Sequence, residues 1–328
     1  MKVDFLTVLI TVLSLIVLAV PGFILKKCKL LPENATKVLT SVLLFIAQPF
    51  LTFMSFQKTQ YKDSILVNML IMAGLALAVH LIMIVLVIVV FGKRGRTDEK
   101  VRVVRFASVF GNCGFLGFPF LQSMFPGKGE ILIYGAVIVA IFNLLSWTVG
   151  IYLITGDKKY VSLRKAILNP PFIALLISLP LFIILKKPIS AIGESGTTVN
   201  LLFAKLSSSF NLLSEMVTPL AMTILGIRLA EMDVKQVLTN KWVYFSSAFK
   251  LVVMPLVAFG IVTLLSGLAI EIKVTLFFIM AMPTATQTLL FSEQYGGEPY
   301  TASSAVLLNT MLCVITIPLM SLLLSVIM

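Results

Sequence analysis

Residues 111–119 read Gly-Asn-Cys-Gly-Phe-Leu-Gly-Phe-Pro and lie near the middle of a stretch, 106–127, that contains no Asp, Glu, Lys or Arg. A helix that crosses a bilayer needs about 20 mostly apolar residues. Proline removes a backbone donor and clashes with the preceding turn, and glycine weakens a helix. The segment is therefore expected to be a membrane-spanning helix that is broken near its middle.

A second segment has the same character. Residues 280–287 read Met-Ala-Met-Pro-Thr-Ala-Thr-Gln within the uncharged stretch 274–292. Backbone groups freed by a break cannot face lipid, so they must face protein or a water-filled cavity. Each break also leaves a half-helix N-terminus with open N–H donors and a partial positive charge. Two breaks that cross near mid-membrane would form an anion-binding site, whereas two unrelated proline kinks are the alternative.

The whole composition indicates an all-α polytopic membrane protein. Of 328 residues, 59% are hydrophobic and only 12% are charged, about half the charged fraction of a typical soluble domain. This balance argues against a soluble secreted enzyme, a disordered regulator or a nucleic-acid-binding module. We expect ten transmembrane helices, which cover residues 5–25, 35–56, 65–91, 103–124, 131–155, 168–185, 209–229, 240–265, 273–293 and 300–327.

The net charge of +12 is read as a signal for topology and for contacts with anionic lipid headgroups rather than for nucleic acid. Lys and Arg are concentrated in alternate loops, at 26–37, 93–105, 158–165 and 228–241. The positive-inside rule predicts that these loops are cytoplasmic and that both termini lie on the non-cytoplasmic side of the plasma (inner) membrane. The connection 186–208 is expected to be a loop with a short surface helix.

Four pairs of similar residues recur at a nearly constant separation close to half the chain, which predicts an internal repeat unless these prolines and polar residues match by chance. Each half would hold five spans, and a repeat with an odd number of spans reverses its orientation in the membrane. We therefore expect a first five-helix repeat at 1–156, a short cytoplasmic linker at 157–167 and an inverted second repeat at 168–328. The matched pairs are Pro49 with Pro219, Pro119 with Pro283, Asn143 with Asn309, and His80 with Lys250.

The chemistry is expected at the two breaks and at polar residues inside spans. An ionisable residue within a span is a functional candidate by default, although Lys250 could instead snorkel to the surface and His80 could be a packing residue. The two span asparagines could hold freed backbone groups or contact substrate. The substrate-binding candidates are Asn112, Gly114, Gly117, Pro119, Pro283, Thr284, Gln287, Asn143 and Asn309. The candidates for charge pairing or ion coupling are Lys250, His80, Gln48, Thr218 and Thr286.

The sequence resembles the auxin efflux carrier family, which includes plant PIN-type carriers and bacterial malate-permease-like proteins. The resemblance runs along the whole chain and rests on five motifs in the family's order. They are Asn112–Pro119, Leu168-Asn169-Pro170-Pro171, Pro219–Gly226, Pro283 followed by Phe291-Ser292-Glu293-Gln294-Tyr295, and Pro318 in the last span.

The resemblance implies two inverted five-helix repeats with scaffold and transport domains, helices 4 and 9 that cross as in the related bile acid sodium symporters, and a homodimer. It also implies a carboxylate substrate near Asn112 and elevator-type alternating access. The plant carriers have a long cytoplasmic loop where this chain has only residues 156–167, so a microbial organic-acid carrier fits better than an auxin carrier.

The leading prediction is thus a secondary transporter of organic anions, such as malate or auxin-like acids, that performs no covalent chemistry. No cofactor or metal is expected, because Cys28, Cys113 and Cys313 have no ligand spacing. Coupling to Na⁺ or H⁺ stays open. The alternatives are a sodium-coupled symporter of larger amphipathic anions, a channel, a sensor on a carrier fold, and an intramembrane enzyme. The last of these lacks any evident nucleophile–base pair.

Overall fold

The protein was analysed as a computed structural model, which describes residues 3–231, 237, 240–265 and 267–326. The described chain is helical, and its only strand-like pairing is one isolated bridge. The first half contains α1 (Phe5–Lys27), α2 (Ala35–Val42), η1 (Leu43–Ala47), α3 (Gln48–Gln57), α4 (Asp63–Phe91), α5 (Arg94–Thr97), α6 (Glu99–Val109), η2 (Cys113–Gly117), α7 (Phe118–Met124), α8 (Gly129–Leu145), η3 (Ser146–Gly150), α9 (Ile151–Thr155) and η4 (Lys158–Tyr160).

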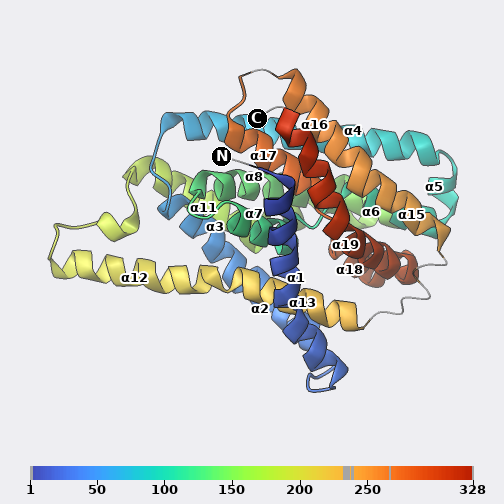
Figure 1. Ribbon diagram of the computed structural model, residues 1–328, viewed down its shortest axis with the longest axis horizontal. Helices are drawn as coiled ribbons and strands as arrows, with labels where there is room; N and C mark the ends of the chain where they lie inside the picture. The colour runs from blue at the N-terminus through green and yellow to red at the C-terminus, as the bar shows by residue number, and fades with distance from the viewer. Residues whose placement is uncertain (1–2, 232–236, 238–239, 266, 327–328) are drawn as a thin grey trace.

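The second half begins with α10 and ends in the C-terminal helix α19, which is red in Figure 1. It contains α10 (Leu163–Ile167), α11 (Pro170–Leu185), η5 (Ile189–Ala191), α12 (Thr198–Glu215), α13 (Val217–Ala230), α15 (Lys241–Ala248), η6 (Phe249–Val253), α16 (Met254–Leu264), α17 (Ile270–Ala281), α18 (Gln287–Tyr295), α19 (Pro299–Ser321) and η7 (Leu322–Val326).

Eight helices among the described residues are long and apolar enough to cross a membrane, which supports the polytopic helical fold. The expected spans 103–124 and 273–293 are not among the eight, because each is divided into two short helices. The count of ten spans and the inverted repeat therefore stay predictions. The eight candidates are Phe5–Lys27, Ala35–Gln57, Asp63–Phe91, Gly129–Thr155, Pro170–Ala191, Thr198–Ala230, Lys241–Leu264 and Pro299–Ser325.

One expected boundary is wrong. The connection 186–208, expected to be a loop with a short surface helix, contains the short helix η5, but its residues 198–208 already belong to α12. The Thr197 hydroxyl caps α12 by accepting a hydrogen bond of 3.2 Å from the Asn200 N–H. The helix ends at Glu215, four residues before Pro219, because the proline ring clashes with the carbonyl at that position. The chain then continues directly into α13.

Prolines also explain three of the π-helical turns. Pro49, Pro119 and Pro255 each follow a π turn, namely η1, η2 and η6. Widening the turn before a proline relieves the ring–carbonyl clash, and such π-bulges often lie at functional sites.

The tightest helix pair is α1 and α13, which cross in Figure 1. A methyl group at Gly22 would lie 2.2 Å from the Thr223 carbonyl oxygen, and one at Gly226 would lie 1.9 Å from the Ala19 carbonyl oxygen. Small residues let two membrane helices approach backbone to backbone, and packing then holds them together. At the end of this pair, Lys26 forms a 2.7 Å ion pair with Glu231.

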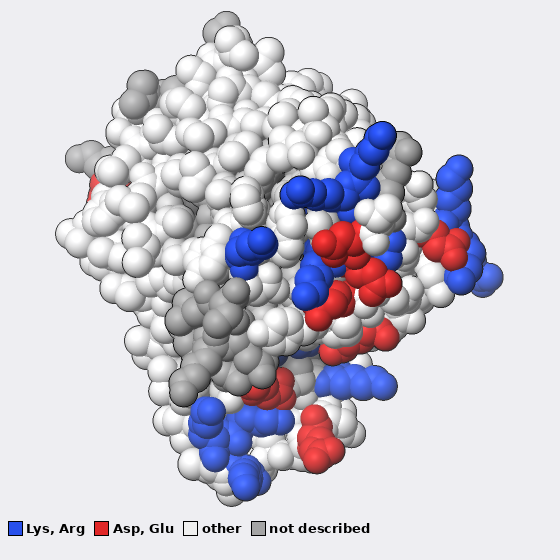
Figure 2. Space-filling view, turned by 90° about the vertical axis from the view of Figure 1, so that its right-hand side faces the viewer, with Lys and Arg blue, Asp and Glu red and all other residues white. Residues whose placement is uncertain are grey.

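Many charged side chains gather at one end of the molecule. Figure 2 looks onto the end where α5, α15 and α18 lie, and shows Lys and Arg interspersed with Asp and Glu beside a broad uncharged surface. Such a surface suits lipid contact. Large apolar side chains are exposed on other helix faces as well, and Leu70 on α4 is 76% exposed. Exposed apolar helix faces of this kind indicate a membrane environment rather than a packing defect.

Candidate functional site

The two broken helices meet at their breaks. Gly111, between α6 and η2, pairs with Thr284, between α17 and α18, as an isolated antiparallel bridge. The Asn112 N–H donates to the Pro283 carbonyl over 2.7 Å, and the Ala285 N–H donates to the Phe110 carbonyl over 2.9 Å. Freed backbone groups of one break therefore satisfy those of the other, as burial away from water requires.

Side chains reinforce this crossing. The Thr284 hydroxyl, which is fully buried, donates to the Ala107 carbonyl over 2.8 Å. Asn112 Oδ1 accepts from the Phe115 N–H over 3.1 Å and so caps η2. Gly117 lies so close to α17 that a methyl group there would come within 2.7 Å of Ile279 Cδ1. Pro119 and Pro283 are buried on either side of these contacts.

Lys250 lies against the crossing and does not snorkel. Its side chain is fully buried within η6. The ammonium donates to the Met280 carbonyl over 2.8 Å and contacts Met254 Sδ at 2.9 Å. Lys250 lies in the π turn that precedes Pro255, where the helix register shifts locally and the side chain is directed toward the crossing.

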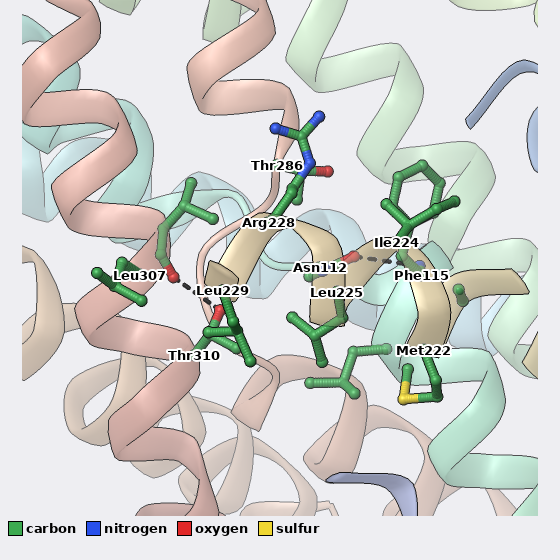
Figure 3. Close-up of a pocket in the computed structure, with 13 residues that line it drawn as sticks. Asn112, Phe115, Met222, Ile224, Leu225, Arg228, Leu229, Thr286, Leu307 and Thr310 are labelled. Atoms are coloured by element: carbon green, nitrogen blue, oxygen red, sulfur yellow. Dashed lines mark hydrogen bonds between the residues drawn. The ribbon is translucent and has the colours of Figure 1, made fainter. Parts of the chain in front are cut away.

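A small cavity of about 20 Å³, room for about one water molecule, lies beside the crossing. Its polar lining comes from Asn112 on one break, Thr286 on the other, Arg228 in the last turn of α13, and Thr310 on α19. Figure 3 shows the Arg228 guanidinium and Thr286 at one edge of this cavity, with Leu225 and Leu229 at the other. Thr310 lies beside Leu229 in the same view, so polar side chains line the cavity on both sides.

The Arg228 guanidinium has N–H donors without a partner among the described residues. Its Nε is buried, and the guanidinium forms no hydrogen bond or ion pair with any residue that the structure describes. Glu231 and Glu293 act on it only at longer range, and the Glu231 carboxylate is held by Lys26. An arginine offers five N–H donors in a planar fork that suits a carboxylate.

The sequence analysis missed Arg228 as a site residue because it placed it at the end of the span 209–229 and used its charge only as a topology signal. The helix α13 continues beyond it to Ala230.

A larger cavity of about 390 Å³ adjoins the first, within the size range of small-molecule sites. The two cavities share several lining residues, among them Leu116, Met222 and Thr310. Of the described residues around the larger cavity, Thr310 is the only one with a hydroxyl, an amide or a charge. Its lining comprises Val12, Leu15, Ile16, Ala19 and Phe23 of α1, Leu116 and Phe120, Met222, Leu225 and Leu229 of α13, and Leu307, Thr310, Met311, Cys313, Val314 and Ile317 of α19.

Gln48 and Gly114 form a further contact at the crossing. Gln48 is 2% exposed, and its Nε2 has no hydrogen-bond partner within the described chain. A methyl group at Gly114 would lie 2.9 Å from that nitrogen. His80 is also buried nearby: its Nδ1 is 2.7 Å from the Ala76 carbonyl, and its ring packs at 6.0 Å from that of Phe110.

The other candidates lie apart from the cavity lining or turn toward their own helices. Thr218 donates to Gln122 Oε1 over 3.0 Å and joins α13 to α7, while Gln287 is the first residue of α18 and is half-buried. The amides of Asn143 and Asn309 donate to the carbonyls four residues earlier, at Val139 and Ala305.

In the described structure the Nδ2 groups of both asparagines donate within their own helices, and that of Asn309 also donates to Ser246 Oγ of α15 over 3.4 Å, so a role in holding the breaks or in contacting substrate stays a prediction. A span amide in a helix readily takes this local partner, because the carbonyl of the preceding turn is the nearest acceptor.

Comparison with known proteins assigns the family. The sequence matches the family described as "Membrane transport protein" over residues 7–163 and again over 158–321. The chain belongs to this membrane transport protein family, which is also the auxin efflux carrier family. It is 26% identical to an uncharacterized transporter of Methanocaldococcus jannaschii over 94% of this chain and 96% of the relative. It is also 25% identical to an uncharacterized transporter of Methanothermobacter thermautotrophicus, over 95% of this chain and 96% of that relative.

Membership of the membrane transport protein family makes the protein a multi-pass membrane transporter and indicates a transport role rather than catalysis. Among the described residues, the crossing brings polar donors to the edge of the smaller cavity, and the larger apolar cavity adjoins it.

Proposed function

We propose that the protein is a secondary transporter of organic anions that carry one carboxylate and an apolar body. The observation that carries the proposal is the Arg228 guanidinium, which has no hydrogen-bond or ion-pair partner among the described residues and lines a cavity together with Asn112 and Thr286 of the two breaks. A charge-assisted hydrogen bond from arginine to a carboxylate is among the strong polar contacts in proteins. The Asn112 amide, whose Nδ2 has no partner within the described residues, would add a further donor.

The neighbouring cavity supports an apolar body for this anion. A dicarboxylate such as malate would place its second charge among Leu, Met, Val and Ile side chains, where desolvation of an ion costs several kcal/mol. An aryl or alkyl chain would instead bury apolar surface there, at a gain of about 25 cal/mol per Å². The amphipathic anions among the earlier alternatives are thus favoured over small dicarboxylates.

Alternating access by an elevator motion is part of the proposal. The Arg228 side chain comes from α13, which is locked to α1, whereas Asn112 and Thr286 come from the crossed breaks. A solute held between two such bodies would be exposed to either side as one body slides past the other. The membrane potential would drive an anion outward by about 2.3 kcal/mol per 100 mV. The homodimer, the plasma membrane and the external termini remain part of the same hypothesis.

The first test is ligand-dependent thermal stabilisation of the purified protein. The probes are 4-phenylbutyrate, its neutral amide and malate, each tested on wild type, Arg228→Gln, Asn112→Ala and the control Arg164→Gln in the linker. A ligand that binds the native state raises the melting temperature by mass action. We expect 4-phenylbutyrate, but neither its amide nor malate, to raise the melting temperature of the wild type. Its binding should be at least tenfold weaker in Arg228→Gln and Asn112→Ala and unchanged in Arg164→Gln.

Equal stabilisation by the neutral amide, or full retention of binding in Arg228→Gln, would overturn the carboxylate site. Counterflow in proteoliposomes then separates a carrier from a channel and from a sensor. Vesicles preloaded with unlabelled 4-phenylbutyrate should transiently accumulate the labelled compound if the protein is a carrier. A channel gives flux without this accumulation, and a sensor gives binding without flux.

A further inference from the structure

Lys250 is the one lysine that lies fully buried among the described residues, and its ammonium is at the crossing itself. It donates to the carbonyl of Met280, in the last turn of α17, directly before the second break. On the other side, a methyl group at Gly111 of the first break would come within 2.8 Å of Nζ. The ammonium is therefore wedged between both broken helices.

The surroundings of this ammonium are those of a bound cation rather than of an ion pair. In the described chain no carboxylate lies within ion-pair distance of it, and its contacts are a carbonyl oxygen and a thioether sulfur. Backbone carbonyls at the end of a half-helix carry partial negative charge and favour a cation. Carbonyl oxygens are also the ligands that alkali cations take when they bind to protein backbones.

The position is also distinct from the solute cavity. Lys250 does not line either of the two cavities, whereas Arg228 lines the smaller one. Arg228 can therefore neutralise the anion directly, while the Lys250 charge acts on the arrangement of the two breaks and thereby on Asn112 and Thr286.

We propose that Lys250 is a built-in cation of the transport site, a positioning residue that holds the two breaks together in place of a dissolved cation. This inference rests on the proposed anion site. It has a direct consequence: the binding of the anion by the wild type requires neither Na⁺ nor K⁺. Removing the ammonium would open a space beside the Met280 carbonyl that a small free cation can fill, so that anion binding then becomes cation-dependent.

The test measures the affinity for 4-phenylbutyrate by thermal shift in buffers whose cation is Na⁺, K⁺ or choline. The proteins are wild type, Lys250→Ala, Lys250→Met and the control Lys205→Ala on the exposed face of α12. Wild type and Lys205→Ala should bind equally in all three buffers. Lys250→Ala should bind at least tenfold more weakly in choline and should recover in Na⁺ or in ethylammonium, which replaces the missing amine. Lys250→Met fills the space without a charge and should not recover.

The outcomes separate this inference from the anion site itself. Failure of the wild type to bind any carboxylate would remove the proposed function and leave the inference without a site. Binding by the wild type that needs Na⁺ would overturn the inference alone, as would unchanged binding in Lys250→Ala with choline. Weak binding in Lys250→Ala that no cation restores would overturn it too, because Lys250 would then serve only as a hydrogen-bond donor. If Lys250→Ala fails to fold, the cation dependence of the wild type decides.

Discussion

Gly111 and Lys250 share one small space at the crossing of the two broken helices. A methyl group at Gly111 would lie 2.7 Å from Lys250 Cε and 2.8 Å from Nζ. Because the lysine is fully buried and its ammonium is held by the Met280 carbonyl, it cannot simply swing into solvent. A glycine at the first break is thus required by a side chain that comes from a different helix, more than one hundred residues later in the sequence.

Gly111→Ala is therefore expected to displace the Lys250 ammonium and lower stability by about 1–3 kcal/mol, the usual cost of overpacking. The change should be seen as a lower melting temperature together with weaker anion binding. Gly74→Ala on α4 is the matched control, because nothing lies within 4 Å of the added methyl group. It should raise stability by up to about 1 kcal/mol through helix propensity. Wild-type behaviour of Gly111→Ala would contradict the placement of Lys250.

The hydrogen bond from Thr284 to Ala107 gives a second prediction. Thr284→Val keeps the shape of the side chain but leaves the buried Ala107 carbonyl without this donor. Thr284→Val is expected to lower the free energy of unfolding by about 1–3 kcal/mol. Thr284→Ser retains the hydroxyl and should keep most of the wild-type stability. Thermal unfolding of the three proteins checks this order. Equal melting of the Val and Ser variants would show that the hydroxyl does not hold the crossing.

The sequence predicted the breaks themselves because their cause is local. Pro119 with the glycines at 111, 114 and 117, and Pro283 with its polar neighbours, interrupt apolar runs in a way that any single helix would show. The membrane-spanning character followed from composition for the same reason. What local pattern could not give is which backbone groups pair across the breaks, such as Asn112 with Pro283.

The role of Arg228 was not evident from the sequence because charge near the end of a span has two interpretations, a loop signal or a buried site. Only the packing of α13 against the crossing places its guanidinium at the cavity. Asn143 shows the opposite limit: an asparagine inside a span suggested a link between helices, yet its amide is satisfied by its own helix at Val139. The partner of a polar side chain depends on tertiary geometry that spacing along one helix does not determine.

The close packing of α1 and α13 gives a third prediction. A methyl group at Gly226 would overlap the Ala19 carbonyl oxygen, which is backbone and cannot rotate away. Gly226→Ala should therefore push the helices apart and lower stability by about 1–3 kcal/mol. Gly260→Ala on α16, with open space around the added methyl group, is the control and should not destabilise. A melting temperature of Gly226→Ala equal to that of the control would refute the backbone contact between α1 and α13.

The larger cavity gives the last prediction, which concerns the size of the anion. Val314 of α19 lines this cavity, whereas its neighbour Ile315 is 61% exposed on the outer face of the same helix. Val314→Phe would fill part of the space, so the affinity for 4-phenylbutyrate should fall about tenfold while any weaker affinity for acetate stays unchanged. Ile315→Phe adds a ring of the same size outside the cavity and should alter neither.

These affinities are measured by thermal shift on the purified variants, with melting in the absence of ligand as the check that each one folds. A tenfold change corresponds to about 1.4 kcal/mol, which is within the range for one or two apolar groups excluded from a pocket. An equal loss of affinity for acetate and 4-phenylbutyrate in Val314→Phe would mean that the cavity supports binding of the carboxylate rather than of an apolar body. No loss for either anion would mean that the body of the substrate lies elsewhere, because a filled cavity cannot also hold a phenyl ring at native packing density.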